Sequence, residues 1–205
     1  MTDKLNTLFQ PRDDVGGFYK AYNDTLLRYL SSLDIAALEA LITGFLTARK
    51  EGKTIFFAGN GGSAATASHF AQDLATVGRK AGVATFKTLS LTDNTSYITA
   101  LANDLGYDRI FSEQMQPLFQ SGDLLVAISA SGNSPNILKA AELAKERGGT
   151  LFALVGFDGG ALAKLADHCL LIKTPKGAYG PVEDAHMIID HLVTGYLVDL
   201  LKEPS

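Results

Sequence analysis

The chain has 205 residues, 46% of them hydrophobic, so we expect one good-sized core with an appended segment. Its 22 acidic and 18 basic residues give a net charge of −4 without a long run of like charge, which argues against nucleic acid as a direct partner. Cys169 is the single cysteine and excludes an intramolecular disulfide, while no run approaches the roughly 18 apolar residues of a membrane span. We therefore expect a cytoplasmic protein with no signal sequence and no membrane partner.

The first 50 residues are expected to be mainly helical. Met1 to Val15 is polar, and we expect its start to be mobile. Apolar residues recur at helical spacing from Gly17 to Lys50, with a break near residues 31–34. These helices carry more apolar surface than an exterior helix needs, so residues 1–50 are predicted to mediate oligomerisation, and residues 51–205 to form the main structural unit.

Strands and helices alternate after residue 50, which predicts an α/β fold with a parallel sheet covered on both faces. The predicted strands are Thr54 to Ala58, Phe86 to Leu91, a run starting at Leu124, Leu151 to Gly156, and Cys169 to Ile172. The predicted helices are Ser63 to about Val77, Asn94 to Asn103, Tyr107 to Phe119, Asn136 to Arg147, a short one from Gly160, and Pro181 to Leu201. His168 adjoins a strand and is expected to cap or pack there.

A serine-rich loop, Ser129-Ala130-Ser131-Gly132-Asn133-Ser134, joins one of these strands to a helix. Ser134 is a good N-cap residue and Pro135 suits the first helical position, so the loop opens onto a helix N-terminus. Free backbone N–H groups and three hydroxyls favour an anion there. The loop contains no lysine or arginine, so a phosphate ester would be held without a formal cation.

A glycine-rich turn, Gly59-Asn60-Gly61-Gly62, follows the first predicted strand, with Ser63 as the expected N-cap of the next helix. The turn also fits the loose dinucleotide-binding fingerprint, which leaves an oxidoreductase as an alternative. A dinucleotide-binding fold would have an acidic residue at the end of the next strand to contact the ribose. The predicted strand from Phe86 to Leu91 has none there, because Asp93 lies a little beyond it. Two such turns at successive strand ends favour a ligand site.

Polar residues on two helices supply possible chemistry. His69 and Asp73 are four residues apart and share a helix face. The last helix carries a cluster of titratable residues at Glu183, Asp184, His186, Asp190 and His191. Glu183 is rotated by roughly 80° from His191 about the axis but is expected to converge with it near the helix start. Such groups suit a divalent metal or a metal-free acid/base pair, or they simply line solvated helix faces.

Several ordered motifs together resemble a sugar-isomerase (SIS) domain, and among its branches phosphoheptose isomerases. The motifs are Gly59-Asn60-Gly61-Gly62-Ser63, His69-Phe70-Ala71, Ala102-Asn103-Asp104-Leu105-Gly106, the segment Ile128 to Ser134, and Gly156-Phe157-Asp158-Gly159-Gly160. The resemblance covers the chain from about Leu26 to Leu201. It implies a three-layer α/β/α sandwich with a five-stranded parallel sheet, assembled as a homotetramer with active sites between subunits.

The implied reaction converts the ketose sedoheptulose 7-phosphate to the aldose D-glycero-D-manno-heptose 7-phosphate, for cell-surface heptose synthesis. By resemblance, the phosphosugar is bound by Asn60, Gly61, Gly62, Ser63, Asp93, Asn94, Ser129, Ala130, Ser131 and Ser134. One Zn²⁺ per subunit would be held by His69, Asp73, Glu183 and His191. The implied catalytic residues are Asp73, Glu183 and His191.

This chain departs from the family pattern at two of those positions. Asp73 stands where the family has glutamate, and Glu183 stands where it has glutamine, so the general base could be either residue. A substrate-contacting aspartate that the family carries is not evident at residues 177–180. An isomerase of a related phosphosugar therefore stays an alternative, as does a non-catalytic SIS adaptor resembling the replication-initiator-associating protein of bacteria. A phosphosugar-responsive transcription regulator would need a basic helix-turn-helix segment, which the sequence lacks.

Overall fold

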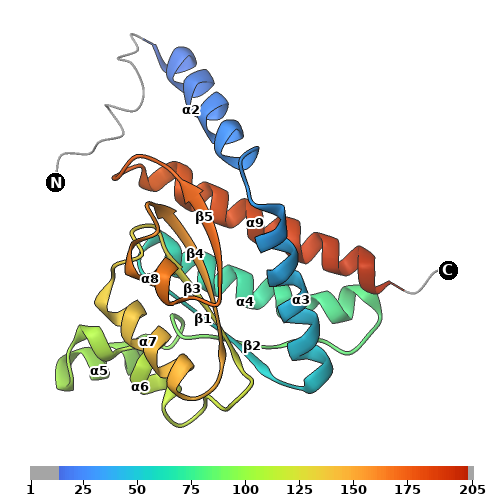
Figure 1. The fold of residues 1–205 in the computed structure, drawn as a ribbon, viewed down its shortest axis with the longest axis vertical. Coiled ribbons are helices and arrows are strands. Elements are labelled where there is room, and N and C mark those ends of the chain that lie inside the picture. The colour runs from blue at the N-terminus through green and yellow to red at the C-terminus, as the bar shows by residue number, and fades with distance from the viewer. Residues whose placement is uncertain (1–13, 203–205) are drawn as a thin grey trace.

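The structure is a computed structural model that describes residues 14–202. A five-stranded, all-parallel sheet with the order β2-β1-β3-β4-β5 lies at its centre, and helices cover both faces (Figure 1). The elements are α2 (Val15–Leu30), α3 (Ile35–Glu51), β1 (Thr54–Gly59), α4 (Gly62–Ala81), β2 (Lys87–Ser90), α5 (Thr95–Asp104), η1 (Tyr107–Arg109), α6 (Ser112–Met115), β3 (Leu124–Ser129), α7 (Pro135–Glu146), β4 (Thr150–Phe157), α8 (Gly160–Leu165), β5 (His168–Lys173) and α9 (Tyr179–Leu201). The predicted three-layer α/β/α sandwich is confirmed. The expected mobile start falls mainly on residues outside the described range.

The central strands β1, β3 and β4 are buried on both faces of the sheet, which explains why these strands read as continuous apolar runs. In β1, Ile55 and Phe57 enter one core, while Phe56 and Ala58 enter the other. The first core is completed by α3, α4 and α9, and the second by α5 to α8. Successive side chains of a strand point to opposite faces, so a single run feeds both cores.

The strand order creates a switch point between β1 and β3. After β1 the chain crosses through α4 to β2 on one side, and after β3 it crosses through α7 to β4 on the other. Because the two connections leave in opposite directions, the carboxyl ends of β1 and β3 border a crevice where ligands of open α/β sheets bind. The glycine-rich turn and the serine-rich loop follow these two strands.

The glycine-rich turn after β1 brings the start of α4 very close to the end of the strand. A Cβ added at Gly59 would lie 2.2 Å from the carbonyl oxygen of Ser63, so only glycine lets α4 begin so close to the end of β1. The N-cap of α4 is Gly61, with φ +55°, and the helix runs to Ala81. The expectation that Ser63 caps this helix and that it ends near Val77 is therefore wrong. Ser63 lies inside the first turn, and its hydroxyl is not used as a cap.

The predicted helix from Tyr107 to Phe119 is broken into η1 and the short α6. The helical hydrogen-bond pattern of the backbone is interrupted at the carbonyl of Ile110. This carbonyl accepts a hydrogen bond of 2.7 Å from the buried side-chain amide of Gln114. The same amide donates to the carbonyl of Leu91, which ties this segment to the end of β2. His168 begins β5 and stacks on Phe152, with ring centroids 4.7 Å apart, so the packing expected of it is confirmed.

The predicted break between the two N-terminal helices is confirmed. Asp34 caps α3 by accepting hydrogen bonds from the backbone amides of Ala36 and Ala37. No single helix within residues 14–202 is long and apolar enough to cross a membrane, although α2 and α3, bent by 71°, pass that test as a pair by length and composition alone. While α3 packs into the first core, α2 projects beyond the three layers (Figure 1). The separate oligomerisation role of residues 1–50 stays a prediction.

Candidate active site

The two loops at the switch point enclose a pocket of about 130 Å³. It is lined by Asn60, Ser63, Ile128, Ser129, Ala130, Ser131, Ser134, Tyr179 and Glu183. Six of the ten predicted substrate-binding residues therefore meet at one place, together with one predicted catalytic carboxylate. No lysine or arginine is among the described residues that line it, as the serine-rich loop suggested.

The loop after β3 presents its hydroxyls to this pocket. Ser129 Oγ accepts a hydrogen bond of 3.2 Å from the amide of Gly132, and Ser131 Oγ accepts one of 3.3 Å from the amide of Asn133. Ser134 occupies the N-cap position of α7, but its hydroxyl makes no capping hydrogen bond within the described chain. The predicted capping bond is therefore wrong, and the hydroxyl stays available to a ligand.

A pair of amide side chains joins the two loops. Asn60 and Asn136 donate to each other's side-chain oxygens, each at 2.9 Å, and Tyr107 donates to Asn60 Oδ1 at 3.0 Å. Asn136 is buried. Asn60 is thus fixed from two sides, with one side-chain N–H left for a ligand. Sequence reasoning missed Asn136 and Tyr107, which only the fold brings to Asn60, and Tyr179, which lines the pocket.

Asp93 and Asn94 do not line the pocket. The Asp93 carboxylate follows the edge strand β2 and accepts hydrogen bonds from the hydroxyls of Ser90 and Thr92. Asn94 caps α5 by accepting a hydrogen bond of 3.1 Å from the amide of Tyr97. Their predicted contacts with substrate stay predictions.

Glu183 lies over the start of α4. A Cβ added at Gly62 would be 2.2 Å from Glu183 Oε2, so the absent side chain at Gly62 makes room for this carboxylate. Gly61 and Gly62 are not among the residues that line the pocket, so their predicted contacts with substrate stay predictions. Burial, and secondarily the negative charge of Asp184, raises the pKa of Glu183. A carboxylate with a raised pKa is better suited to accept a proton near neutral pH than an ordinary surface glutamate is.

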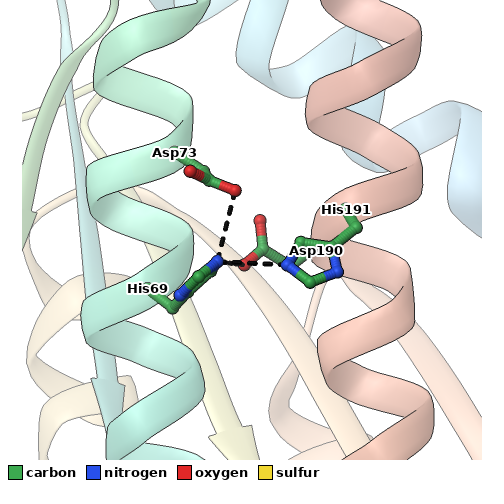
Figure 2. Close-up of side chains that lie close together, drawn as sticks. All are labelled: His69, Asp73, Asp190 and His191. Carbon is green, nitrogen blue, oxygen red and sulfur yellow. Dashed lines mark hydrogen bonds and ion pairs between the residues drawn. The ribbon is translucent and has the colours of Figure 1, made fainter.

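A second polar cluster lies farther along α4 and α9, formed by His69, Asp73, Asp190 and His191 (Figure 2). Each residue offers one ligand atom, and these four atoms all lie within 4.8 Å of one another. His69 Nε2 is 3.1 Å from His191 Nε2 and 3.3 Å from Asp73 Oδ2. Two imidazoles and two carboxylates at this spacing are a donor set that fits Zn²⁺.

Three of the four predicted metal ligands meet in this cluster, and Asp190 stands in place of the fourth. The expectation placed Glu183 near His191 by its angle around the helix. The two residues are also eight positions apart, which separates them along the axis by about 12 Å at 1.5 Å per residue. The structure accordingly brings Glu183 to the serine-lined pocket.

Asp190 is the most unusual member of the cluster. Its side chain is fully buried, and neither carboxylate oxygen accepts a hydrogen bond from any residue that the structure describes. Burial raises its pKa to about 7, with a further rise caused by the nearby charge of Asp73. A buried carboxylate without a partner is costly, so this position in the cluster is suited to a cation.

Comparison with known proteins places this chain and its fold in one family. A family model described as SIS domain matches residues 18–156. The phosphoheptose isomerase of Rhodospirillum rubrum is 38% identical over 190 residues, which cover 92% of this chain and 98% of that protein. A solved phosphoheptose isomerase from Neisseria gonorrhoeae superposes with a TM-score of 0.80 at 30% identity, over 90% of this chain and 98% of that one.

The chain belongs to the SIS domain family. Within that family it groups with the phosphoheptose isomerases, since that of Sulfurimonas denitrificans is also 45% identical over 146 residues, covering 71% of this chain and 72% of that protein. The predicted family and fold are confirmed. The roles of individual residues at the pocket and at the four-residue cluster are proposals, developed below.

His186, on the same helix as this SIS-domain site, gives a testable prediction. Its ring is fully buried, and burial lowers its pKa from 6.5 to about 4. Between these values the unfolded chain takes up a proton that the folded protein does not bind, so stability is lost as the pH falls through this window. We expect this loss of unfolding free energy to be about 3 kcal/mol smaller in His186→Phe than in the parent.

Urea unfolding of both proteins at about pH 7 and about pH 4.5 measures this difference. An equal loss of unfolding free energy in the variant and the parent would contradict the assignment.

Proposed function

We propose that this protein is an aldose–ketose isomerase that converts sedoheptulose 7-phosphate to D-glycero-D-manno-heptose 7-phosphate in heptose biosynthesis. The observation that carries the proposal is the juxtaposition, along α4 and α9, of a hydroxyl-lined pocket, a carboxylate of raised pKa and a cluster of metal-ligand type. The family membership and the names of the relatives support the same reaction. The enzyme is proposed to act in the cytoplasm.

In this proposal the phosphate group binds the loop after β3. Ser129, Ser131 and Ser134 supply hydroxyls, Ala130 lies between them, and the N-terminus of α7 supplies its dipole. Hydrogen bonds to a charged acceptor are stronger than those to a neutral one, so hydroxyls and amides suffice without lysine or arginine. Related phosphosugars would use the same loop.

The sugar chain is proposed to extend from this loop along the first turns of α4. Asn60, Gly61, Gly62 and Ser63 would contact its hydroxyls, with Asp93 and Asn94 as further contacts. His69 lies six residues after Ser63, which is about 9 Å along the helix axis. An extended phosphosugar would thus reach from the serine-rich loop to the four-residue cluster.

The chemistry requires a base that takes a proton from one carbon and returns it to its neighbour through an enediolate. Glu183 and Asp73 are the candidates. Glu183 faces the pocket and has a raised pKa, which favours it as the base. Asp73 is close to His69 in the cluster, where its lone pairs would serve a metal. His191 is proposed to orient the substrate oxygens from the cluster.

His69, Asp73 and His191 fit Zn²⁺ in donor type and spacing, and one ion per subunit is proposed. When bound, the ion would supply positive charge that stabilises the developing negative charge on the sugar oxygens. The two imidazoles would then direct Nε2 toward the ion, with their protons on Nδ1.

Turnover of sedoheptulose 7-phosphate tests the reaction directly. We expect the purified protein to produce the aldose 7-phosphate, detected by NMR, and to introduce solvent deuterium at the carbon next to the aldehyde. Conversion of another phosphosugar in place of this one would favour the related-substrate alternative. Absence of turnover with every phosphosugar tried, in protein with zinc bound, would contradict an isomerase.

The serine-rich loop gives a second prediction. Ser131→Ala and Ser134→Ala should each weaken phosphosugar binding by about 1.5 to 3 kcal/mol, the range for a hydrogen bond to a charged group. Because the Ser134 hydroxyl makes no capping bond, Ser134→Ala should leave the free energy of unfolding within about 0.5 kcal/mol of the parent. Calorimetric titration and urea unfolding measure the two quantities. Unchanged affinity in both variants would exclude the loop as the phosphate site.

A homotetramer is proposed because α2 exposes large apolar side chains. Val15 is 84% exposed, Tyr19 68% and Leu27 61%. The Tyr22 hydroxyl donates a hydrogen bond to Asp184, which holds this helix against the start of α9. Light scattering at micromolar concentration should return about four times the mass of the chain. A monomer mass would contradict the proposal, and replacing Tyr19 and Leu27 by serine should shift the mass downward if α2 forms the interface.

A further inference from the structure

The Asp190 carboxylate accepts no hydrogen bond from the residues that the structure describes. This carboxylate is fully buried, and its nearest positively ionisable neighbour, His69, has Nε2 at 4.0 Å, beyond hydrogen-bond distance. Of the other charged groups, Asp73 repels it, and Lys80 attracts it more weakly than Asp73 repels it. A buried charge without pairing or hydrogen bonds costs several kcal/mol, so the fold is expected to hold a cation against this carboxylate.

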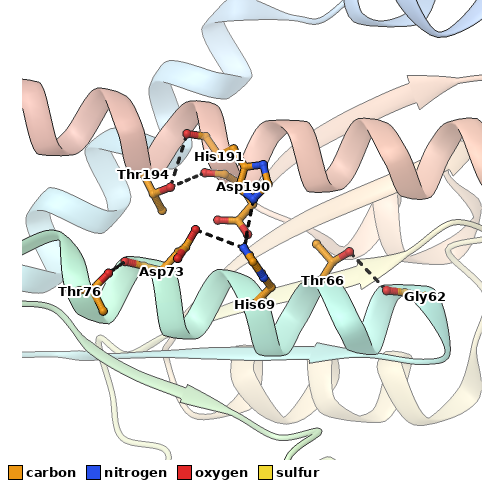
Figure 3. A network of polar contacts seen from close by, with 8 residues as sticks. All are labelled: Gly62, Thr66, His69, Asp73, Thr76, Asp190, His191 and Thr194. Carbon is orange, nitrogen blue, oxygen red and sulfur yellow. Dashed lines mark hydrogen bonds and ion pairs between the residues drawn. The ribbon is translucent and has the colours of Figure 1, made fainter. Parts of the chain in front are cut away.

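The threonine hydroxyls along the two helices donate to backbone carbonyls (Figure 3). Thr194 donates to the backbone carbonyl of Asp190, and Thr66 and Thr76 donate to the carbonyls of Gly62 and Asp73 on α4. These threonines satisfy helix carbonyls and none donates to the Asp190 carboxylate. The side chain is thus aimed between the two helices toward the two imidazoles and Asp73.

The spacing of the cluster fits one ion. Ligand atoms that lie about 2.0 to 2.1 Å from a tetrahedral Zn²⁺ stand about 3.4 Å from one another. The cluster has 3.1 Å between the two Nε2 atoms, 3.3 Å from His69 Nε2 to Asp73 Oδ2, and 4.0 Å from His69 Nε2 to Asp190 Oδ2. Small side-chain rotations would bring all four atoms to such a site. Two carboxylates and two neutral imidazoles would balance the charge of a divalent cation.

We propose that Asp190, and not Glu183, is the fourth protein ligand of a divalent cation, with His69, Asp73 and His191. Glu183 lies about two helical turns from Asp190, or about 10 Å along α9, and its carboxylate rests against Gly62 at the pocket. This assignment deepens the proposed function, because it completes the ion site and leaves Glu183 free at the sugar. It also makes the ion a link between α4 and α9.

Zinc binding without substrate tests the assignment. Chelator-treated protein is titrated with Zn²⁺ by calorimetry, and bound zinc is counted after dialysis. We expect Asp190→Asn and Asp190→Leu to weaken zinc binding by at least about 100-fold, since each removes a charged ligand. Glu183→Gln should bind zinc within about threefold of the parent, as should Asp199→Asn, an exposed carboxylate farther along the same helix.

Thermal unfolding separates a ligand from a merely structural residue. Without metal, Asp190→Asn should melt no lower than the parent, because it removes an unpartnered buried charge, yet the zinc-induced rise in melting temperature should be lost. Glu183→Gln should keep that rise. A metal-free Asp190→Asn protein that melts lower and still binds zinc at parental affinity would overturn the proposal. Loss of zinc in Glu183→Gln but not in the Asp190 variants would also overturn it.

These outcomes are independent of turnover. Zinc binding that depends on Asp190 in a protein without isomerase activity would support this assignment while the proposed reaction failed. Full isomerase activity in protein that binds no zinc would overturn this assignment while the reaction stood.

Discussion

The packing of α4 against α9 is the constraint on which the site depends. Apolar residues spaced along each helix, such as Phe70 and Leu74 on α4 and Ile189 and Val193 on α9, are fully buried between the helices and the sheet. This contact fixes which polar residues face each other at each level along the pair. Glu183 meets the first turn of α4, and Asp190 and His191 meet His69 and Asp73 farther along. A shift of the helices by one turn would break both pairings together.

The fold follows from local sequence features, whereas the ligand set does not. Short local patterns predicted all five strands, with continuous apolar runs in β1, β3 and β4, and the Gly- and Ser-rich turns marked the ends of β1 and β3. These signals lie within a few neighbouring residues. The position of Glu183 could not be read in the same way. Its angle around α9 suggested convergence with His191, but which partner it meets depends on the register between two helices far apart in the chain. The burial of Asp190 could not be predicted either, because nothing in the neighbouring sequence distinguishes it from a surface carboxylate.

Both serines that were expected to cap helices, Ser63 and Ser134, have hydroxyls released for a ligand. The backbone geometry makes this possible, because glycine at positions 59 and 61 turns the chain into α4 without a side-chain cap, and Pro135 begins α7 with a residue that has no N–H to satisfy. The amide pair of Asn60 and Asn136 then holds the two turns in fixed relation. A pocket for an anion can thus be built from neutral donors that the helix ends would otherwise use.

The two carboxylates nearest the reaction have different environments, and this separates their roles. A carboxylate that coordinates a cation loses basicity, because its lone pairs are engaged and the positive charge favours its ionised form. Asp73 lies within the four-residue cluster and is in that position. Glu183 faces only the pocket, and burial with the charge of Asp184 makes it more basic. If Asp190 completes the ion site, Glu183 is left free for proton transfer at the pocket, a role that a neutral amide in its place could not perform. Burial beside the two imidazoles then assigns one carboxylate of α9 to the ion, and the raised pKa at the pocket assigns the other to the proton.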